Sequence, residues 1–368
     1  MSYKSIDALQ NALSELVFSH TESPKKAAGR ALGTIIEIMS FYLIKTWGYE
    51  YETAIEKPLP EYANLDITHN VEFTLHRNKK IREVSRGDDS ISSSRLFKDS
   101  GLSSPYTRLK TSRNFIKNGI LKNACTFATT DKTFCNAYLG RDSHILMYEL
   151  DNAPYAMFEC KRVGVEEGNK KGPQTIEKAK QGSYVARTVS SIQRFRKSDG
   201  SVAGIVEHQG KIDFNDDYYH LIDEAIANKR NDILSRYILT VGIVSNHGNW
   251  FTSNNQNKEM KVLAQSYDWL LFLTDEGLAN FVQDTLVKPK RGYEPIQRAF
   301  QNSYSSGKGN NRFTKTTMDL EADAIISQYF SRQIQRIESW FNVIAPHTGN
   351  ISKLKDVLNK LRTLEGLA

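Results

Sequence analysis

The chain has 368 residues, of which 39% are hydrophobic and 25% are charged. This composition is typical of a folded protein with a sizeable core and excludes a disordered chain. The formal net charge is +7, which favours a polyanionic partner. The three cysteines lack zinc-site spacing, and their odd number argues against a disulfide framework. The sequence shows no secretion signal and no apolar run of the ~20 residues that a spanning helix needs, so we expect a cytoplasmic protein.

A long amphipathic helix is predicted over residues 24–45. It begins at Ser23 and Pro24, a capping hydroxyl followed by proline in the first turn. Apolar residues recur on one face at helical spacing, and Glu37 lies off that face. The helix therefore presents one face to the core and a carboxylate beside it.

Two short strands are predicted next, over 49–52 and 71–76, with a proline-containing loop between them. The segment 77–134 that follows is polar and rich in Ser, Lys, Arg and Asn. Up to Lys122 it holds twelve basic and four acidic residues. Such composition predicts a basic insertion on the surface of the core.

A β-hairpin is predicted over 145–161. Residues 145–150 form an apolar strand, 151–154 have turn chemistry, and 155–161 form a second strand. If the turn is centred between residues 152 and 153, Asp142, Glu159 and Lys161 project from one face of the hairpin.

The remainder of the chain alternates helices and strands. A helix is predicted over 173–195, strands over 237–245 and 269–274, and two helices between 315 and 367. The pattern predicts an α/β fold in which a central mixed sheet is flanked by helices.

Asp142, Glu159 and Lys161 are the candidate catalytic residues. Metal-assisted hydrolysis of a phosphodiester needs carboxylates that hold Mg²⁺ and a cation that orients water or offsets developing charge. Two acids and one lysine on a single face supply those groups. Asp151 is a rival ligand, but it lies at the far turn of the hairpin.

The arrangement resembles the PD-(D/E)xK signature of restriction-endonuclease-like nucleases. The matching residues are Gly140-Arg-Asp142, an apolar strand, a turn, a second strand and Glu159-Cys-Lys161. Arg141 stands where the family usually has proline. The helix with Glu37 resembles the family's leading helix, and Gln181-Gly-Ser-Tyr184 resembles the Q-x-x-Y element of one branch.

The resemblance implies a restriction-endonuclease-like core within 1–285, interrupted by the insertion 77–134, and a basic loop with a helical extension over 286–368. It implies a type II restriction endonuclease that cuts double-stranded DNA with Mg²⁺ and leaves 5′-phosphate ends. By this resemblance, Asp142, Glu159 and the Cys160 carbonyl of this chain would hold the metal, and Lys161 would orient water. The remaining expectations are supporting roles for Glu37 and Gln181, a homodimer, and a cognate DNA methyltransferase encoded nearby.

The basic insertion supplies the candidate DNA contacts. Arginine and asparagine can read base edges, whereas lysine mostly holds phosphate. The candidates are Arg95, Lys98, Arg108, Lys110, Arg113, Asn114 and Lys117. The alternative is a solvated basic loop with no ligand.

Other interpretations of the sequence remain open. Glu159 and Lys161 can be an exposed pair at a strand end, Asp142 a turn-capping acid, and Glu37 and Gln181 ordinary helix residues. At the level of the whole chain, the alternatives are a repair or recombination nuclease with the same core and a DNA-binding protein on an inactive nuclease scaffold.

Overall fold

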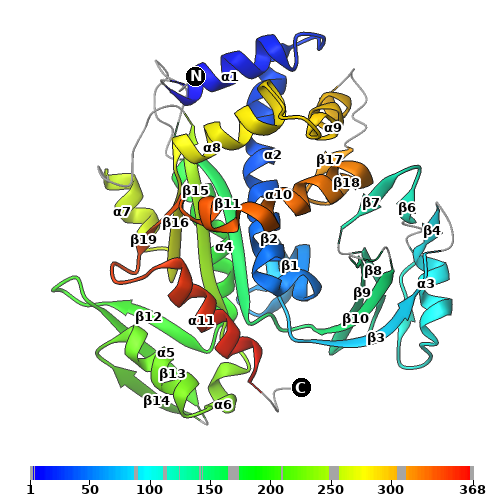
Figure 1. Cartoon of the computed structure of the whole chain (residues 1–368). Coiled ribbons are helices and arrows are strands. Elements are labelled where there is room, and N and C mark those ends of the chain that lie inside the picture. The colour runs from blue at the N-terminus through cyan, green and yellow to red at the C-terminus, as the bar shows by residue number, and fades with distance from the viewer. Residues whose placement is uncertain are drawn as a thin grey trace.

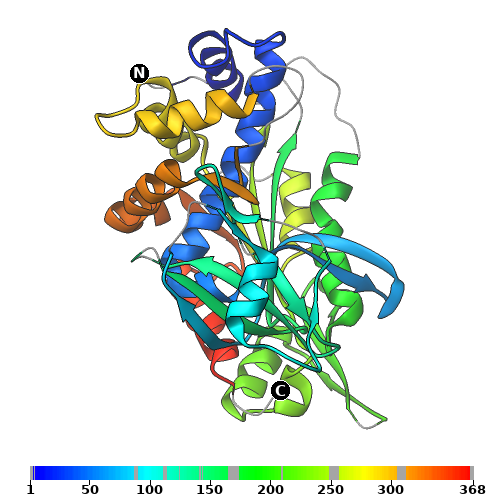
Figure 2. The ribbon, with the colours of Figure 1, turned by 90° about the vertical axis from the view of Figure 1, so that its right-hand side faces the viewer.

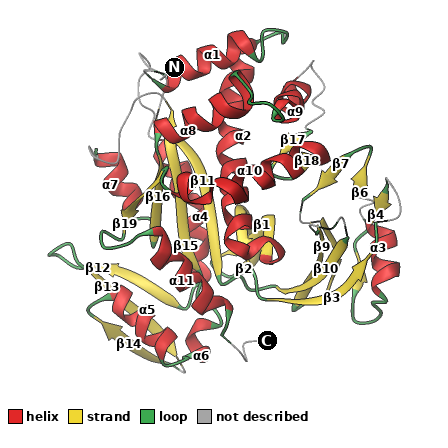
Figure 3. Ribbon diagram, viewed as in Figure 1, coloured by secondary structure: helices red, strands yellow, loops and turns green. Residues whose placement is uncertain are grey.

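A six-stranded mixed sheet forms the centre of this computed structural model, with helices on both of its faces (Figures 1 and 3). The structure describes residues 3, 5–86, 90–110, 114–123, 125–140, 142, 144–164, 174–208, 210–247, 257–304 and 312–364. In order across the sheet, the strands are β1 (Thr53–Glu61), β2 (Asn64–Leu75), β11 (Ala156–Gly164), β15 (Leu239–His247), β16 (Trp269–Leu273) and β19 (Phe341–Ala345). β11, β15 and β16 are parallel, whereas β1, β2 and β19 each run antiparallel to a neighbour. The prediction of a mixed α/β fold with a flanked central sheet is confirmed.

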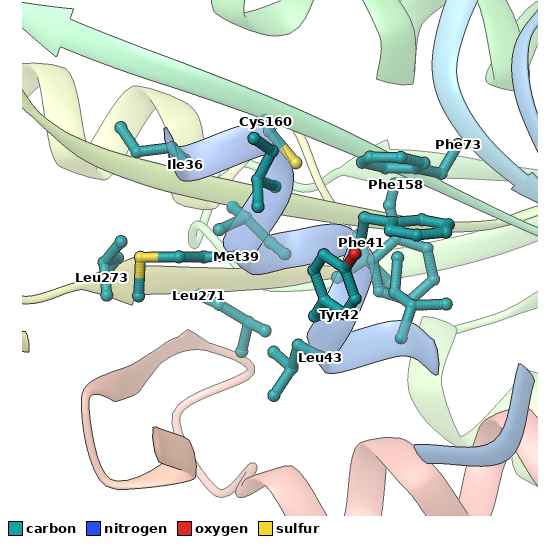
Figure 4. Close-up of a cluster of buried hydrophobic side chains, with 14 of the residues drawn as sticks. Ile36, Met39, Phe41, Tyr42, Leu43, Phe73, Phe158, Cys160, Leu271 and Leu273 are labelled. Atoms are coloured by element: carbon teal, nitrogen blue, oxygen red, sulfur yellow. The ribbon is translucent and has the colours of Figure 1, made fainter. Parts of the chain in front are cut away.

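Helix α2 (Pro24–Ile44) is the core helix of the molecule. Its apolar side chains cover the face of the sheet that carries Phe73, Phe158 and Cys160, and Phe41 stacks on Phe73 (Figure 4). Together with the turns that follow it, this helix is long and apolar enough to cross a membrane by length and composition, but its most apolar window is 72% buried inside the structure. Its hydrophobicity is therefore explained by its central position.

A second, five-stranded sheet stands beside the first in Figure 1 and lies in front of it in Figure 2. Across this sheet the strands are β3 (Asn78–Val84), β10 (Ile145–Asp151), β9 (Thr133–Leu139), β8 (Cys125–Thr129) and β5 (Thr107–Arg108). Helix α3 (Ser93–Ser100) packs on it, and Leu96, Phe115 and Phe127 are completely buried in its core. The basic segment 77–134 is therefore a packed unit with a core of its own, and β10 belongs to it.

Two neighbouring strands pass from the first sheet into the second. β2 continues into β3 after His76 and Arg77, and β10 continues into β11 after residues 152–155. β3 pairs antiparallel with β10, as β2 does with β11.

The predicted hairpin of β10 with β11 is wrong. Residues 152–155 do not turn the chain back, because the Asp151 amide donates to the Arg77 carbonyl and the Tyr155 amide donates to the Leu75 carbonyl. The chain thus keeps running beside the same neighbour, and β10 pairs with β9 and β3 instead.

The C-terminal part of the chain contributes strands to the central sheet and to a further five-stranded sheet. β19 completes the central sheet, while β17 (Phe313–Thr314) and β18 (Thr317–Asp319) pair onward to β7 (Ile120–Lys122), β6 (Asn114–Lys117) and β4 (Ile91–Ser92). A small antiparallel sheet of β12 (Ile192–Arg196), β13 (Val202–His208) and β14 (Lys211–Asn215) lies at the other end of the molecule.

The remaining helices surround these sheets. They are α1 (Ile6–Leu16), η1 (Lys45–Tyr49), η2 (Glu50–Glu52), α4 (Gln174–Val189), α5 (Tyr218–Ala227), α6 (Asn231–Leu234), α7 (Lys258–Ala264), α8 (Asp275–Val282), η3 (Gln283–Val287), α9 (Glu294–Tyr304), α10 (Leu320–Glu338) and α11 (Ile351–Arg362). The predicted long helix, the strands within β15 and β16, and two C-terminal helices are confirmed. The predicted strand over 49–52 is a helical turn. The proline-containing loop predicted between 52 and 71 is instead β1 and the first part of β2. The helix predicted over 173–195 ends at Val189.

Candidate active site

The candidate site lies where β2 and β11 separate. Their ladder holds three residue pairs and ends at Phe73 opposite Phe158. Glu72 and Glu159 are the next residues on each strand, so two carboxylates stand at the opening between the strands. The backbone amide of Glu72 donates to Oε2 of Glu159 at 3.3 Å, which fixes the second carboxylate against the first strand.

Lys161 joins these two acids. Its Nζ lies 2.8 Å from Oε1 of Glu159 and 3.1 Å from Oε1 of Glu72. The carboxylate side chains are 3% and 7% exposed, respectively. Because buried carboxylates are costly unless they are paired, an arrangement of this kind needs its lysine.

A second lysine extends the cluster. Nζ of Lys315, a residue of the turn between β17 and β18, lies 2.7 Å from Oε2 of Glu72, 3.2 Å from Oε1 of Glu56 and 3.4 Å from Oε2 of Glu37. Glu37 comes from α2 and Glu56 from β1, so four separate segments meet here. The predicted position of Glu37 beside the site agrees with this geometry.

The cluster is short of positive charge. Burial and the Glu72 carboxylate raise the pKa of Glu37 to about 7, although Lys315 opposes this effect. Burial also raises the pKa of Glu159, with Lys161 opposing. In its fully ionised form the cluster has four carboxylates and two ammonium groups, a deficit equal to the charge of one divalent cation.

The donor set suits Mg²⁺, which prefers carboxylate and water oxygens. Among the residues that the structure describes, no three acidic, histidine or cysteine side chains stand at metal-ligand spacing, because the two lysines lie between the acids. Glu72 and Glu159 are the pair that would hold the ion, with water completing its coordination.

Helix α4 closes one side of the site. A Cβ added at Gly182 would lie 2.7 Å from Oε2 of Glu159 and 2.9 Å from Cε of Met157, so glycine permits the close approach of helix and carboxylate. The neighbouring Gln181 and Tyr184 are exposed, and Tyr184 instead contacts Tyr62.

The structure does not bring Asp142 to Glu159 and Lys161. Asp142 is exposed in a turn before β10, at the end of the second sheet remote from β11. The whole of β10, the link 152–155 and the start of β11 lie between Asp142 and Glu159 in the chain. Asp142 was expected beside Glu159 and Lys161 only because a hairpin of these two strands was predicted. Glu72 stands in the position that the sequence interpretation gave to Asp142.

Cys160 points away from the carboxylates. Its buried side chain lies on the α2 face of the sheet (Figure 4), as expected for the residue between Glu159 and Lys161 on an alternating strand. The predicted role of its carbonyl as a metal ligand stays a prediction.

Glu72 and Lys315 were missed by the sequence interpretation. The signal for Glu72 is an acid inside the predicted strand Val71-Glu72-Phe73, because a charge in a buried strand needs a partner. Lys315 lies in a polar turn far along the chain, and its position follows only from long-range pairing.

The described candidate DNA contacts lie on α3, near β5 of the second sheet and on β6, which pairs with β7 and β4. Arg95 and Lys98 are exposed on α3, although Arg95 also pairs with Asp99 at 3.4 Å. The other described candidates are Arg108 and Lys110 near β5 and Asn114 and Lys117 on β6, all exposed except the half-buried Asn114. Arg113 lies outside the described residues.

A polar cleft of about 740 Å³ separates the two sheets beside the site. Its wall includes Glu56, which contacts Lys315, as well as the side chains of Lys57 and Lys122. Neutral hydrogen-bonding groups line much of it, namely Asn70, Asn123, Thr126, Thr129, Thr316 and Thr317. The remaining lining residues are Ala54, Ile55, Pro58, Leu109, Cys125 and Phe134. The cleft therefore borders the carboxylate cluster at Glu56.

Comparisons with protein-family models, with curated proteins and with solved structures found no match for this chain.

Proposed function

We propose that the chain is a Mg²⁺-dependent DNA endonuclease of the restriction-endonuclease-like class, most similar in function to a type II restriction enzyme. The observation that carries the proposal is the meeting of Glu72, Glu159 and Lys161 where two antiparallel strands of a mixed sheet separate. The order of elements supports it: a leading helix, β1, β2 and β11, then α4 and the parallel strand β15.

Glu72 and Glu159 would bind the metal, with Lys161 beside them. When bound, Mg²⁺ polarises a phosphate oxygen and lowers the pKa of a coordinated water. The Lys161 ammonium, held by both carboxylates, orients a water molecule and offsets the negative charge that develops on the phosphate. Glu37, whose pKa is about 7, is able to take up or release a proton near neutral pH.

Double-stranded DNA is the proposed substrate because the polar cleft reaches Glu56 of the carboxylate cluster and the segment 77–134 that lines its other wall carries exposed cations. Cutting both strands of a duplex requires two sites, which favours a homodimer with one site per subunit. A restriction role further requires a cognate DNA methyltransferase.

Incubation of supercoiled plasmid with the purified chain and Mg²⁺ tests the proposal. We expect discrete fragments with 5′-phosphate ends and no cleavage when EDTA is present. Smeared or structure-dependent products would instead indicate a repair or recombination nuclease. Retained DNA binding without any cleavage would reject the enzymatic role and leave a DNA-binding protein.

A further inference from the structure

Lys315 is surrounded by acids from three elements. Its side chain is 8% exposed, and its Nζ lies within 3.4 Å of carboxylate oxygens of Glu37, Glu56 and Glu72. Three carboxylate oxygens from separate segments therefore surround one positive charge. A divalent cation also binds among several such oxygens. Here the charge is supplied by the protein.

The insertion holds the turn that carries Lys315. The Asn123 side-chain amide donates to the Lys315 carbonyl at 3.0 Å, and the Asn123 backbone amide donates to the Thr316 carbonyl at 3.2 Å. Nζ of Lys122 donates to Oγ1 of Thr317 at 3.0 Å. The position of the ammonium is thus fixed by strand pairing between β18 and β7 and by side chains that line the cleft.

We propose that Lys315 is a positioning residue that serves as a built-in cation. Its ammonium pairs with Glu37, Glu56 and Glu72 in the place where a second divalent ion would otherwise bind, so the site takes one metal ion and not two. The inference rests on the proposed function and specifies its metal requirement. Lys161 keeps a separate task, because among the contacts described its ammonium bridges Glu72 and Glu159, not Glu37 or Glu56.

The test counts Mn²⁺ ions bound per full-length chain by isothermal titration calorimetry after removal of metals with EDTA. We expect one ion for the wild type and two for Lys315→Met, because the variant loses the ammonium that Glu37, Glu56 and Glu72 share and leaves Glu72 with Lys161 alone. Lys315→Arg restores the charge and should return the count to one. Circular dichroism and thermal melting establish that each variant is folded.

Lys57→Met is the matched control. It removes the same charge from β1, next to Glu56, but the Lys57 ammonium lies over the Phe134 ring, 3.7 Å from its centre. We expect the count to stay at one. A role of Lys315 in folding alone would lower the melting temperature without changing the number of ions.

Two ions in the wild type would overturn the inference, and this measurement needs no variant. A folded Lys315→Met chain that still binds one ion would overturn it as well. If the wild type binds none, the proposed metal-dependent hydrolysis fails. In that case a gain of one ion by Lys315→Met supports the built-in cation, and no gain rejects it.

Discussion

Two buried carboxylates share one ammonium at the candidate site, and this pairing determines what each substitution does. Removing the charge of Glu72 or Glu159 leaves Lys161 with a single partner, whereas removing Lys161 leaves two buried acids with less compensation. The loss of one partner from a buried ion pair costs stability as well as function. Isosteric amide variants therefore separate the two effects better than alanine variants do.

Glu72→Gln is expected to reduce plasmid cleavage on the order of 10²-fold or more, because the charge of a proposed metal ligand is lost. Asp142→Asn should cut at the wild-type rate, since Asp142 is exposed and remote from Glu159. Initial rates under saturating Mg²⁺ give the comparison, with DNA binding measured in Ca²⁺. The reverse pattern would restore Asp142 to the site and remove Glu72.

Lys161→Ala should likewise abolish cleavage and leave DNA affinity largely intact, because the proposed role of Lys161 is at the reacting phosphate and the proposed DNA contacts lie elsewhere. Gel-shift affinity and single-turnover cleavage measured on the same preparation give the answer. A variant that cuts normally would mean that the cluster is only structural.

Glu37 gives the site a pH dependence. Its pKa is raised from 4.5 to about 7, so between these values the folded chain holds a proton that the unfolded chain has released. Stability from this residue is therefore lost as pH rises from about 4.5 to 7. In EDTA, the free energy of unfolding of the wild type should fall relative to Glu37→Gln across this window and stay constant outside it. Urea titrations at several pH values measure this difference in the free energy of unfolding. A difference that rises with pH across the window would contradict a buried Glu37.

At the scale of elements, α4 is set against β11 by a glycine. Gly182→Ala places a methyl group 2.7 Å from Oε2 of Glu159, so the carboxylate must move. Alanine is otherwise favoured in a helix by about 1 kcal/mol. We expect cleavage to fall at least tenfold while the melting temperature changes little.

Gly33→Ala in α2 is the control for that variant. Nothing lies within 4 Å of its added Cβ, so activity should be unchanged and stability equal or higher. Equal activity of the two variants would show that α4 does not position Glu159.

The predicted elements that held are those with strong local signals. The Ser23-Pro24 start and the apolar stripe defined α2, and apolar runs defined β15 and β16. The hairpin failed because strand neighbours in sequence are usually neighbours in a sheet, whereas residues 152–155 carry the chain from one sheet to the other. The same error misplaced the first acid of the site, although Glu159, Lys161 and Glu37 do lie together in it.

On the scale of the whole molecule, the exposed cations of the second sheet are the proposed source of DNA affinity. Arg108→Ala combined with Lys110→Ala should weaken binding at low salt. Each lost phosphate contact lowers the slope of log K against log salt concentration by about 0.9, so we expect the slope to fall by about 2.

Lys258→Ala combined with Lys261→Ala removes the same charge from α7, on the opposite side of the molecule (Figure 1). This control should leave the salt slope unchanged. Equal loss in both double variants would mean that affinity follows net charge and not a defined contact surface. Composition predicted a basic segment, but its buried core and its pairing with β18 depend on contacts between residues far apart in sequence, which local patterns do not specify.

The second sheet is attached to the core at His76–Arg77 and at residues 152–155, a few positions from Glu72 and Glu159, respectively. We expect a tilt of that sheet, such as one that widens the cleft for a bulky ligand, to shift β2 and β11 and with them the two carboxylates. A ligand that enters the cleft would then also change how Glu72 and Glu159 are aligned.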